Sequence, residues 1–262
     1  MKITVKFIFK WILAAVVLVA VALALSWTIV TYIHNNNASY YFYTVNEDGL
    51  SCTVTGVAEG VGSGHRGLYI PDKLDGYTVT AIAEEAFMGN EYAADLRIPE
   101  TVTYIGARAF KDCINSTMVY IPGSVEFIGE GVFEGCVKLR YINVRKGLTA
   151  LPDNFAKGCT KLEIVWICDS VVSIGDNAFY DCDSIVNIVI NADAESIGVN
   201  AFAECDKLKR LLYLSTEQDW QAVDADENVT PLVFYYSEQK PSVKGQYWYR
   251  DEKLINYIWN YD

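Results

Sequence analysis

Five of the seven cysteines recur at a constant interval of 23 residues, which raises the question of what thiol chemistry they could support. They are Cys113, Cys136, Cys159, Cys182 and Cys205. In an exported chain, regularly spaced cysteines suggest disulfides. A zinc site would instead need closely paired cysteines or several histidines. The sequence has no Cys-x-x-Cys and only two His, so we expect no metal site and no cofactor.

The constant interval favours packing over disulfide chemistry. Asn90 lies 23 residues before Cys113, so the position does not require a thiol. Thiols in neighbouring units would be close, but their parallel Cβ vectors are poor disulfide geometry. We therefore expect free thiols that fill a small interior slot, because free Cys behaves as a compact hydrophobe. Disulfides are the alternative, and mass spectrometry with and without reductant separates the two.

Two further segments contain the residue types of phosphate-binding, catalytic or calcium-binding sites but lack the spacing that such sites require. The loop from Gly60 to Gly67 has no Gly-Lys-Ser/Thr ending, so we interpret it as a flexible connector. Within it, His65 beside Ser63 is a weak candidate for a general base, since no oriented acid is evident. The run from Asp224 to Asn228 begins like a calcium loop but lacks the Gly and Glu that should follow. An exposed acidic turn is the simpler interpretation, with weak calcium binding as the alternative. No catalytic residue is expected, and the chain is not predicted to be an enzyme.

The elements that would position these residues recur with the same period. One apolar series is Ile98, Ile121, Val144, Ile167 and Ile190, and a second is Ile105, Ile128, Leu151, Ile174 and Ile197. A phenylalanine series accompanies them: Phe87, Phe110, Phe133, Phe155, Phe179 and Phe202. Several series in one register indicate a solenoid of stacked units, none of which buries its apolar face alone.

Each unit has three predicted parts. Alternation in Leu96–Pro99 predicts a strand, and stacking would place such strands in a parallel sheet. A second extended piece spans Val102–Ile105, and Gly106–Cys113 is expected to return the chain as a helical turn. Around Leu151–Phe155 the order Ala-Phe becomes Phe-Ala, which predicts a reshaped turn. The first unit has five additional residues around Asp72–Gly76, expected to form a protruding loop.

The unit L-x-I-P-x-x-V-x-x-I-G-x-x-A-F-x-x-C-x-x-L, read at Leu96–Ile114 and again at Val119–Leu139, resembles the BspA-type leucine-rich repeat of bacterial and some protist surface proteins. The resemblance covers residues 68–236. Tyr41–Val57 resembles the N-terminal hairpin of that family, and Ser215–Asp262 resembles its C-terminal cap. The family implies surface display with adhesion or ligand binding, and it implies no catalytic set.

The predicted organisation has four parts. Residues 1–33 form a cytoplasmic stub and transmembrane signal-anchor, and 34–67 a linker and capping hairpin. Residues 68–214 form the leucine-rich repeats, and 215–262 the C-terminal cap. The fold class is thus a β-rich leucine-rich repeat solenoid of parallel strands with short helical turns, an N-terminal β-hairpin, a C-terminal cap and a single N-terminal transmembrane helix. In the cap, Tyr247-Trp248-Tyr249 would alternatively suit a sugar-binding platform.

The anchor prediction rests on the uncharged run from Trp11 to Ile33. As a helix it would be about 34 Å long, enough for a hydrocarbon core of about 30 Å. Lys2, Lys6 and Lys10 precede it, so the positive-inside rule keeps the N-terminus in the cytoplasm and the repeats outside the plasma membrane. Cleavage after Ala22-Leu23-Ala24 is the alternative and would give a secreted protein. The net charge of −12 argues against nucleic acid as a partner.

Outward-facing side chains are the remaining functional candidates. The residue between the two inward positions of each strand must face solvent, which gives a column that ends at Val189 and Leu212. The candidate ligand contacts are Tyr69, Arg97, Tyr104, Tyr120, Phe127, Asn143 and Trp166. Exposed aromatics are enriched at recognition surfaces, so the expected partner is a protein or glycan on another cell or matrix. Alternatively the aromatics only shield the sheet, or the repeats are a scaffold for envelope assembly that binds proteins of the same membrane.

Overall fold

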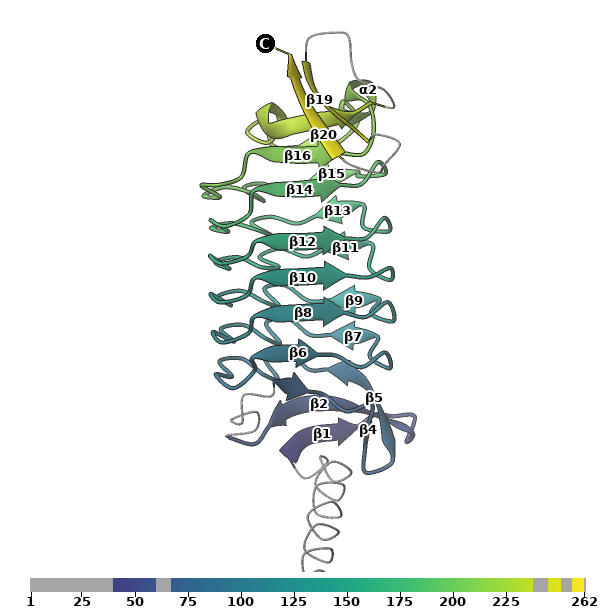
Figure 1. The fold of residues 1–262 in the computed structure, drawn as a ribbon. Coiled ribbons are helices and arrows are strands. Elements are labelled where there is room, and N and C mark those ends of the chain that lie inside the picture. The colour runs from purple at the N-terminus through teal and green to yellow at the C-terminus, as the bar shows by residue number, and fades with distance from the viewer. Residues whose placement is uncertain (1–39, 60–66, 238–244, 251–255, 262) are drawn as a thin grey trace, which may run out of the picture. The chain divides into compact units, whose positions relative to one another are not determined.

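The computed structural model describes residues 40–59, 67–237, 245–250 and 256–261. The chain from Tyr40 to Asp262 forms one compact unit of stacked coils (Figure 1). The segment predicted as an anchor, residues 11–33, lies outside the described residues, as does His65. Within the part of the chain that is described, no helix combines the length and apolar character that a membrane span requires.

The predicted N-terminal hairpin is present and is joined to the solenoid. Strands β1 (Tyr41–Val45) and β2 (Ser51–Val57) pair antiparallel. In the turn between them the Asp48 carboxylate accepts hydrogen bonds from the amides of Leu50 and Ser51. Strand β2 then pairs in parallel with β5 (Tyr77–Ile82), so the hairpin continues one of the solenoid sheets.

The prediction of a protruding loop at Asp72–Gly76 was wrong. Strand β4 (Lys73–Leu74) pairs antiparallel with β5, and the Leu74 side chain is fully buried. Asp75 and Gly76 make the tight turn with φ of 48° and 94°. Positive φ at both central residues is the geometry that suits a two-residue hairpin, which the Asp-Gly pair allows.

The first half of each coil supplies a parallel sheet, here called the front sheet. Its strands are β3 (Leu68–Tyr69), β6 (Asp95–Arg97), β8 (Met118–Ile121), β10 (Tyr141–Val144) and β12 (Ile164–Ile167). From β6 onward each residue pairs with the residue 23 positions later, for example Asn143 with Trp166. The predicted parallel stacking is therefore confirmed, and the register places equivalent side chains side by side across the sheet.

The front sheet ends at β12, and a second five-stranded sheet continues the stack. It contains β14 (Asn187–Ile190), β16 (Arg210–Tyr213), β18 (Val233–Tyr236), β19 (Gly245–Arg250) and β20 (Asn256–Tyr261). Strands β19 and β20 pair antiparallel, and β19 pairs with β18. The C-terminal hairpin predicted as a cap therefore does lie against the last strand of the array.

The second half of each coil forms short strands on another side of the stack. Strands β7 (Tyr104–Ile105) and β9 (Phe127–Ile128) extend the sheet that contains β5. A separate four-stranded sheet follows, made of β11 (Ala150–Leu151), β13 (Ser173–Ile174), β15 (Ser196–Ile197) and β17 (Asp224–Ala225). After β16 the chain makes helix α2 (Glu217–Trp220), capped by Thr216, and later the 3-10 helix η2 (Thr230–Leu232).

The third part of each coil, the return half, is not the helical turn that the sequence predicted. Alternate amides donate to the next coil, as Glu85 does to Ala107, Phe87 to Ala109 and Gly89 to Lys111. The amides between them donate three residues back within the same coil, as Met88 does to Glu85, and later coils repeat this pattern. This pattern needs two left-handed residues per coil. The first series is Glu85, Arg108, Gly131, Asn154, Asn177 and Asn200, and the second is Gly89, Asp112, Gly135, Gly158, Asp181 and Glu204. Left-handed residues interrupt a helix, so consecutive turns replace it.

The core is a column of phenylalanine rings stacked along the array. Neighbouring rings lie 5.3–5.9 Å apart from Phe87 to Phe202, and Tyr41 contacts Phe87 edge-on. Phe155, from the coil with the inverted Phe-Ala order, stays fully buried but stands at 89° to Phe133 and 72° to Phe179. The reshaped coil therefore rotates one ring without breaking the column.

The cysteine series lines the same interior. All seven cysteines are free, and the five regular thiols each donate to a main-chain carbonyl of the preceding coil at 3.0–3.2 Å. The acceptors are the carbonyls of Phe87, Phe110, Phe133, Ala156 and Phe179. Burial raises the pKa of the Cys113, Cys159 and Cys182 thiols well above their usual range, and that of Cys205 to about 11. These thiols are held protonated, which makes them poor nucleophiles.

Candidate recognition surface

Five of the predicted contact residues form one row across the front sheet, here called the front column. Tyr69 pairs with Arg97, Arg97 with Tyr120, Tyr120 with Asn143, and Asn143 with Trp166. The aromatic members occupy every second strand, and the polar members lie between them. Tyr69, Tyr120 and Trp166 expose 41%, 44% and 59% of their surface. Since neighbouring strands lie about 4.8 Å apart, successive aromatic residues of the column are about 10 Å apart.

Part of the front column is held in place by contacts on the same face. The Arg97 guanidinium lies over the Tyr69 ring, 5.0 Å from its centroid. Tyr141 packs against Tyr120 at 5.4 Å, and its hydroxyl accepts a hydrogen bond from the Asn143 amide at 3.0 Å. Sequence analysis had not singled out Tyr141. The signal was present, because Tyr141 lies two residues before Asn143 on the same strand, and alternate residues of a strand share a face.

Trp166 borders a groove of about 540 Å³ where β10 and β12 end. Its walls include Asn143, Trp166, Arg145 and Glu100. The Arg145 guanidinium pairs with the Glu100 carboxylate at 3.1 Å, across two coils. Cys168, also in the wall, donates to the Arg145 carbonyl at 3.2 Å. The sequence does not predict this groove, because its walls come from coils whose residues lie up to 68 positions apart, from Glu100 to Cys168.

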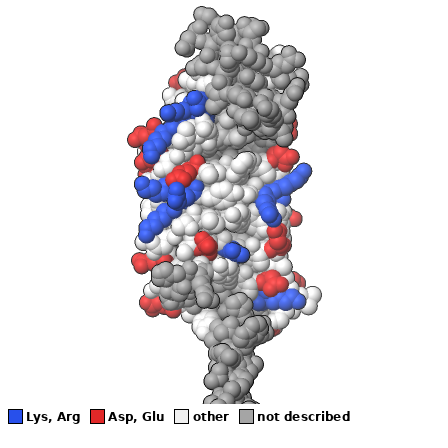
Figure 2. Space-filling model, viewed as in Figure 1, with Lys and Arg blue, Asp and Glu red and all other residues white. Residues whose placement is uncertain are grey.

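Charge is distributed unevenly around the front column. In Figure 2, the middle of this face is mostly free of Lys, Arg, Asp and Glu, which gather mainly along its two edges. Exposed ion pairs link neighbouring coils along these edges, such as Arg140 with Glu163 at 2.9 Å. Such pairs contribute about 0–1 kcal/mol each. Apart from Arg97 of the front column, the centre of the face therefore offers a ligand apolar and neutral polar groups.

Tyr104 and Phe127, the other two predicted contacts, are not part of this surface. They lie on β7 and β9 in the sheet that contains β5, where their rings stack at 4.9 Å and 8°. Phe127 nevertheless exposes 51% of its surface. The expected end of the column also needs correction, because Leu212 is buried: Phe234 of β18 and Tyr236 pack against it.

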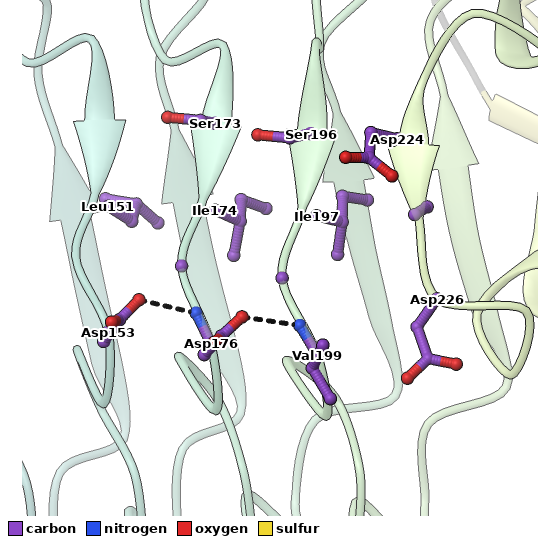
Figure 3. A pocket seen from close by; sticks show the side chains of 13 residues that line it. Leu151, Asp153, Ser173, Ile174, Asp176, Ser196, Ile197, Val199, Asp224 and Asp226 are labelled. Atoms are coloured by element: carbon purple, nitrogen blue, oxygen red, sulfur yellow. Dashed lines mark hydrogen bonds between the residues drawn. The ribbon is translucent and has the colours of Figure 1, made fainter.

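A second groove, of about 570 Å³, runs along β11, β13, β15 and β17 and is acidic (Figure 3). Three of its four carboxylates serve the fold. Asp153 accepts a hydrogen bond from the Asp176 amide and Asp176 from the Val199 amide, each at 2.7 Å. Asp226 accepts from both nitrogens of Asn228, which closes the acidic turn predicted there. Among the described residues, no group of three or more His, Cys, Asp or Glu is placed to hold a metal ion.

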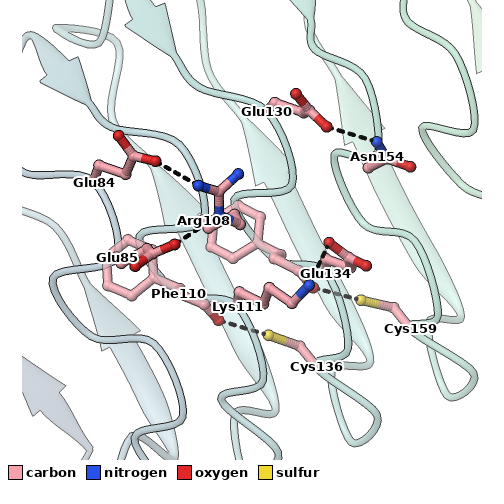
Figure 4. A network of polar contacts seen from close by, with 11 residues as sticks. Glu84, Glu85, Arg108, Phe110, Lys111, Glu130, Glu134, Cys136, Asn154 and Cys159 are labelled. Atoms are coloured by element: carbon pink, nitrogen blue, oxygen red, sulfur yellow. Dashed lines mark hydrogen bonds and ion pairs between the residues drawn. The ribbon is translucent and has the colours of Figure 1, made fainter.

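The return half also carries a polar network on its outer side (Figure 4). Arg108 bridges Glu84 and Glu85 of the preceding coil, and Lys111 pairs with Glu134 of the following one at 3.0 Å. Hydrogen bonding to Glu85 raises the pKa of Arg108. Since each of these partners belongs to a neighbouring coil of the same chain, the network holds adjacent coils together.

The comparisons with known proteins agree with this architecture. Residues 80–209 match the family described as BspA type Leucine rich repeat region, in six copies. The repeat region of this chain therefore belongs to the BspA-type leucine-rich repeat family. No match was found among curated proteins.

Solved leucine-rich repeat structures are similar to the chain. A protein from Eubacterium ventriosum is 17% identical with a TM-score of 0.50, over 83% of this chain and 54% of that one. A leucine rich cell surface protein from Faecalibacterium prausnitzii is 24% identical with a TM-score of 0.49, over 83% and 58%. The Treponema pallidum leucine-rich repeat protein is 21% identical with a TM-score of 0.47, over 72% and 79%. The match to the first establishes the shared fold only, and the chain spans just over half of the two longer proteins.

Proposed function

We propose that this chain is a non-catalytic recognition module that binds a partner through the front column. The observation that carries the proposal is the row of exposed aromatic side chains on a face whose centre is nearly free of charge. Large amphipathic aromatics bury much area at low entropic cost, which is why they dominate binding hot spots. Among the described residues, the interior consists largely of stacked rings and of thiols that burial keeps protonated, which supports a non-catalytic role.

We further propose that the module is displayed outside the cytoplasm on the anchor of residues 11–33. The uncharged run and the preceding lysines support this, and the Faecalibacterium prausnitzii relative is described as a cell surface protein. Carbonate washing of membranes should leave the chain in the pellet, and detergent should release it. Protease added to intact cells should digest the repeats. Recovery of the chain in the culture medium would instead indicate cleavage of the anchor.

The recognition proposal is tested with the full chain and two variants displayed on cells. Replacing both Tyr120 and Trp166 with Ala should abolish adherence to other cells or to matrix. Replacing Tyr92 with Ala is the matched control, because Tyr92 exposes a similar 41% of its surface but lies in a connection between coils. Equal adherence of the two variants would refute the front column as the binding surface. Retained partners of the same membrane in a pull-down would favour a scaffold role instead.

A further inference from the structure

We infer that the front column binds a neutral, extended glycan chain whose sugar rings stack on alternate strands; this rests on the recognition role proposed above and names its ligand. The first argument is spacing. Tyr69, Tyr120 and Trp166 lie on every second strand, about 10 Å apart. That interval is comparable with the length of one disaccharide in an extended β-1,4-linked chain. A polymer running along the stack would therefore present equivalent sugar rings to Tyr120 and Trp166, whereas the Arg97 guanidinium covers one face of the Tyr69 ring.

The second argument is the chemistry of the aromatic and polar groups. One face of a pyranose ring carries aliphatic C–H groups, which suit the electron-rich face of an aromatic ring. The hydroxyls at the edge of the sugar need planar donors and acceptors instead. Arg97 and Asn143 supply these between the aromatics, and the Asn143 amide oxygen accepts no hydrogen bond from the described residues. The column thus alternates a stacking group with a hydrogen-bonding group.

The third argument is the groove next to Trp166. Besides Trp166, its lining includes Asn143, Glu100, Arg145 and Lys146, and the Arg145 guanidinium pairs with the Glu100 carboxylate. A carboxylate, an amide and a guanidinium each bind two neighbouring hydroxyls at once. The groove therefore suits the end of a sugar chain, or a branch from it, better than the apolar side chains of a protein partner.

Charge complementarity decides which glycans fit. The chain carries a net charge of −12, and the centre of the face is mostly uncharged. Arg97 is already stacked on Tyr69, and Arg145 is already paired with Glu100. A sulfated or carboxylated polymer would be disfavoured by the net negative charge of the chain, although Lys146 in the groove has no described ion-pair partner, whereas a neutral polymer pays no such penalty. The proposed ligand is therefore a neutral β-linked polysaccharide.

The test measures chain-length dependence by calorimetry on the full chain in a zwitterionic detergent, which avoids sugar headgroups that would compete. The probes are cello-oligosaccharides and chito-oligosaccharides, as disaccharide, tetrasaccharide and hexasaccharide. Affinity should rise by about tenfold when the probe becomes long enough to reach a second aromatic residue. A sulfated heparin hexasaccharide should bind more weakly than either neutral one.

The variants separate the column from the rest of the surface. Replacing Trp166 with Ala should weaken hexasaccharide binding by about tenfold or more, and replacing Tyr120 with Ala should remove the gain from lengthening the probe. Replacing Tyr92 with Ala should change nothing. Undetectable binding of all neutral probes, or an equal loss in the Tyr92 variant, would overturn the inference. If cell adherence still depended on Tyr120 and Trp166 in that case, the recognition role would stand with a protein as its partner.

Discussion

The interior and the front column are built on the same 23-residue period but use it in opposite ways. Inside, the same residue type returns in each coil, because every Phe ring must fill the space between two other rings. On the front face the residue changes from strand to strand, from Tyr to Arg to Tyr to Asn to Trp. A change of residue type in the close-packed interior leaves a cavity or a clash, whereas a side chain that faces solvent can change without either. The comparison indicates that stability lies in the repeated columns and specificity in the varied one.

The largest expected effect comes from breaking the ring column. Replacing Phe133 with Ala should lower the free energy of unfolding by about 3–5 kcal/mol, because it leaves a cavity between two buried rings. Urea denaturation of the full chain, followed by circular dichroism, measures this. Replacing exposed Phe127 with Ala is the control, and it should cost far less. Similar losses in both variants would contradict the division between interior and surface.

A smaller effect should appear in alkali at Cys205. Its pKa is about 11 in the folded chain, against a usual value near 9, so above pH 9 the unfolded chain binds fewer protons than the folded one. Stability from this thiol is complete below pH 9 and is lost as the pH rises to 11, by about 2–3 kcal/mol. The Cys205→Ser variant cannot ionise there. Its free energy of unfolding relative to that of the natural chain should therefore rise between pH 9 and pH 11. If the difference between the two chains did not change with pH, the raised pKa of Cys205 would be refuted.

The left-handed positions predict a gain of stability. Glu204 has a φ of 57°, whereas the equivalent positions at Gly135 and Gly158 are already glycine. Glu204→Gly should raise the free energy of unfolding by about 1 kcal/mol, since glycine adopts this conformation without the clash of a Cβ. Conversely, Gly158→Ala should lower the free energy of unfolding by a similar amount. No atom lies closer than 3.8 Å to the new methyl group, so only backbone strain remains. The expected outcome is a higher free energy of unfolding for Glu204→Gly and a lower one for Gly158→Ala.

The smallest stability effect is expected on the front column itself. Replacing Trp166 with Ala should change the free energy of unfolding by no more than about 0.5 kcal/mol, because the side chain is 59% exposed. Thermal melting of the same sample used for binding checks this. A loss as large as that of the Phe133 variant would mean that Trp166 is a structural residue and that stability does not lie in the interior columns alone.

Much of this molecule follows from its period, but three features do not. The register of the strands and the Phe and Cys columns could be predicted, because equal spacing forces equal positions in a stack. The return half does not follow from the period, since its conformation depends on left-handed φ at two positions per coil. Nine of these twelve positions are Gly, Asn or Asp, which favour that conformation, and only Glu85, Arg108 and Glu204 give no such signal. The groove beside Trp166 depends on residues of four successive coils at once. The burial of Leu212 depends on Phe234, which lies beyond the repeats.

Between the two left-handed residues of each return half, every second amide donates to the next coil, so the dipoles of these peptides add along the stack. Like an α-helix, this side of the molecule therefore has a positive and a negative end. The carbonyls of Glu84 and Ala86 mark the negative end. The amides of Asn200 and Phe202, which reach no acceptor among the described residues, mark the positive one. Asp226 borders the same cavity as these amides. The negative charge of the acidic turn thus opposes the positive end of this dipole. Aspartate suits this end of the stack because the amides of the return half point toward it.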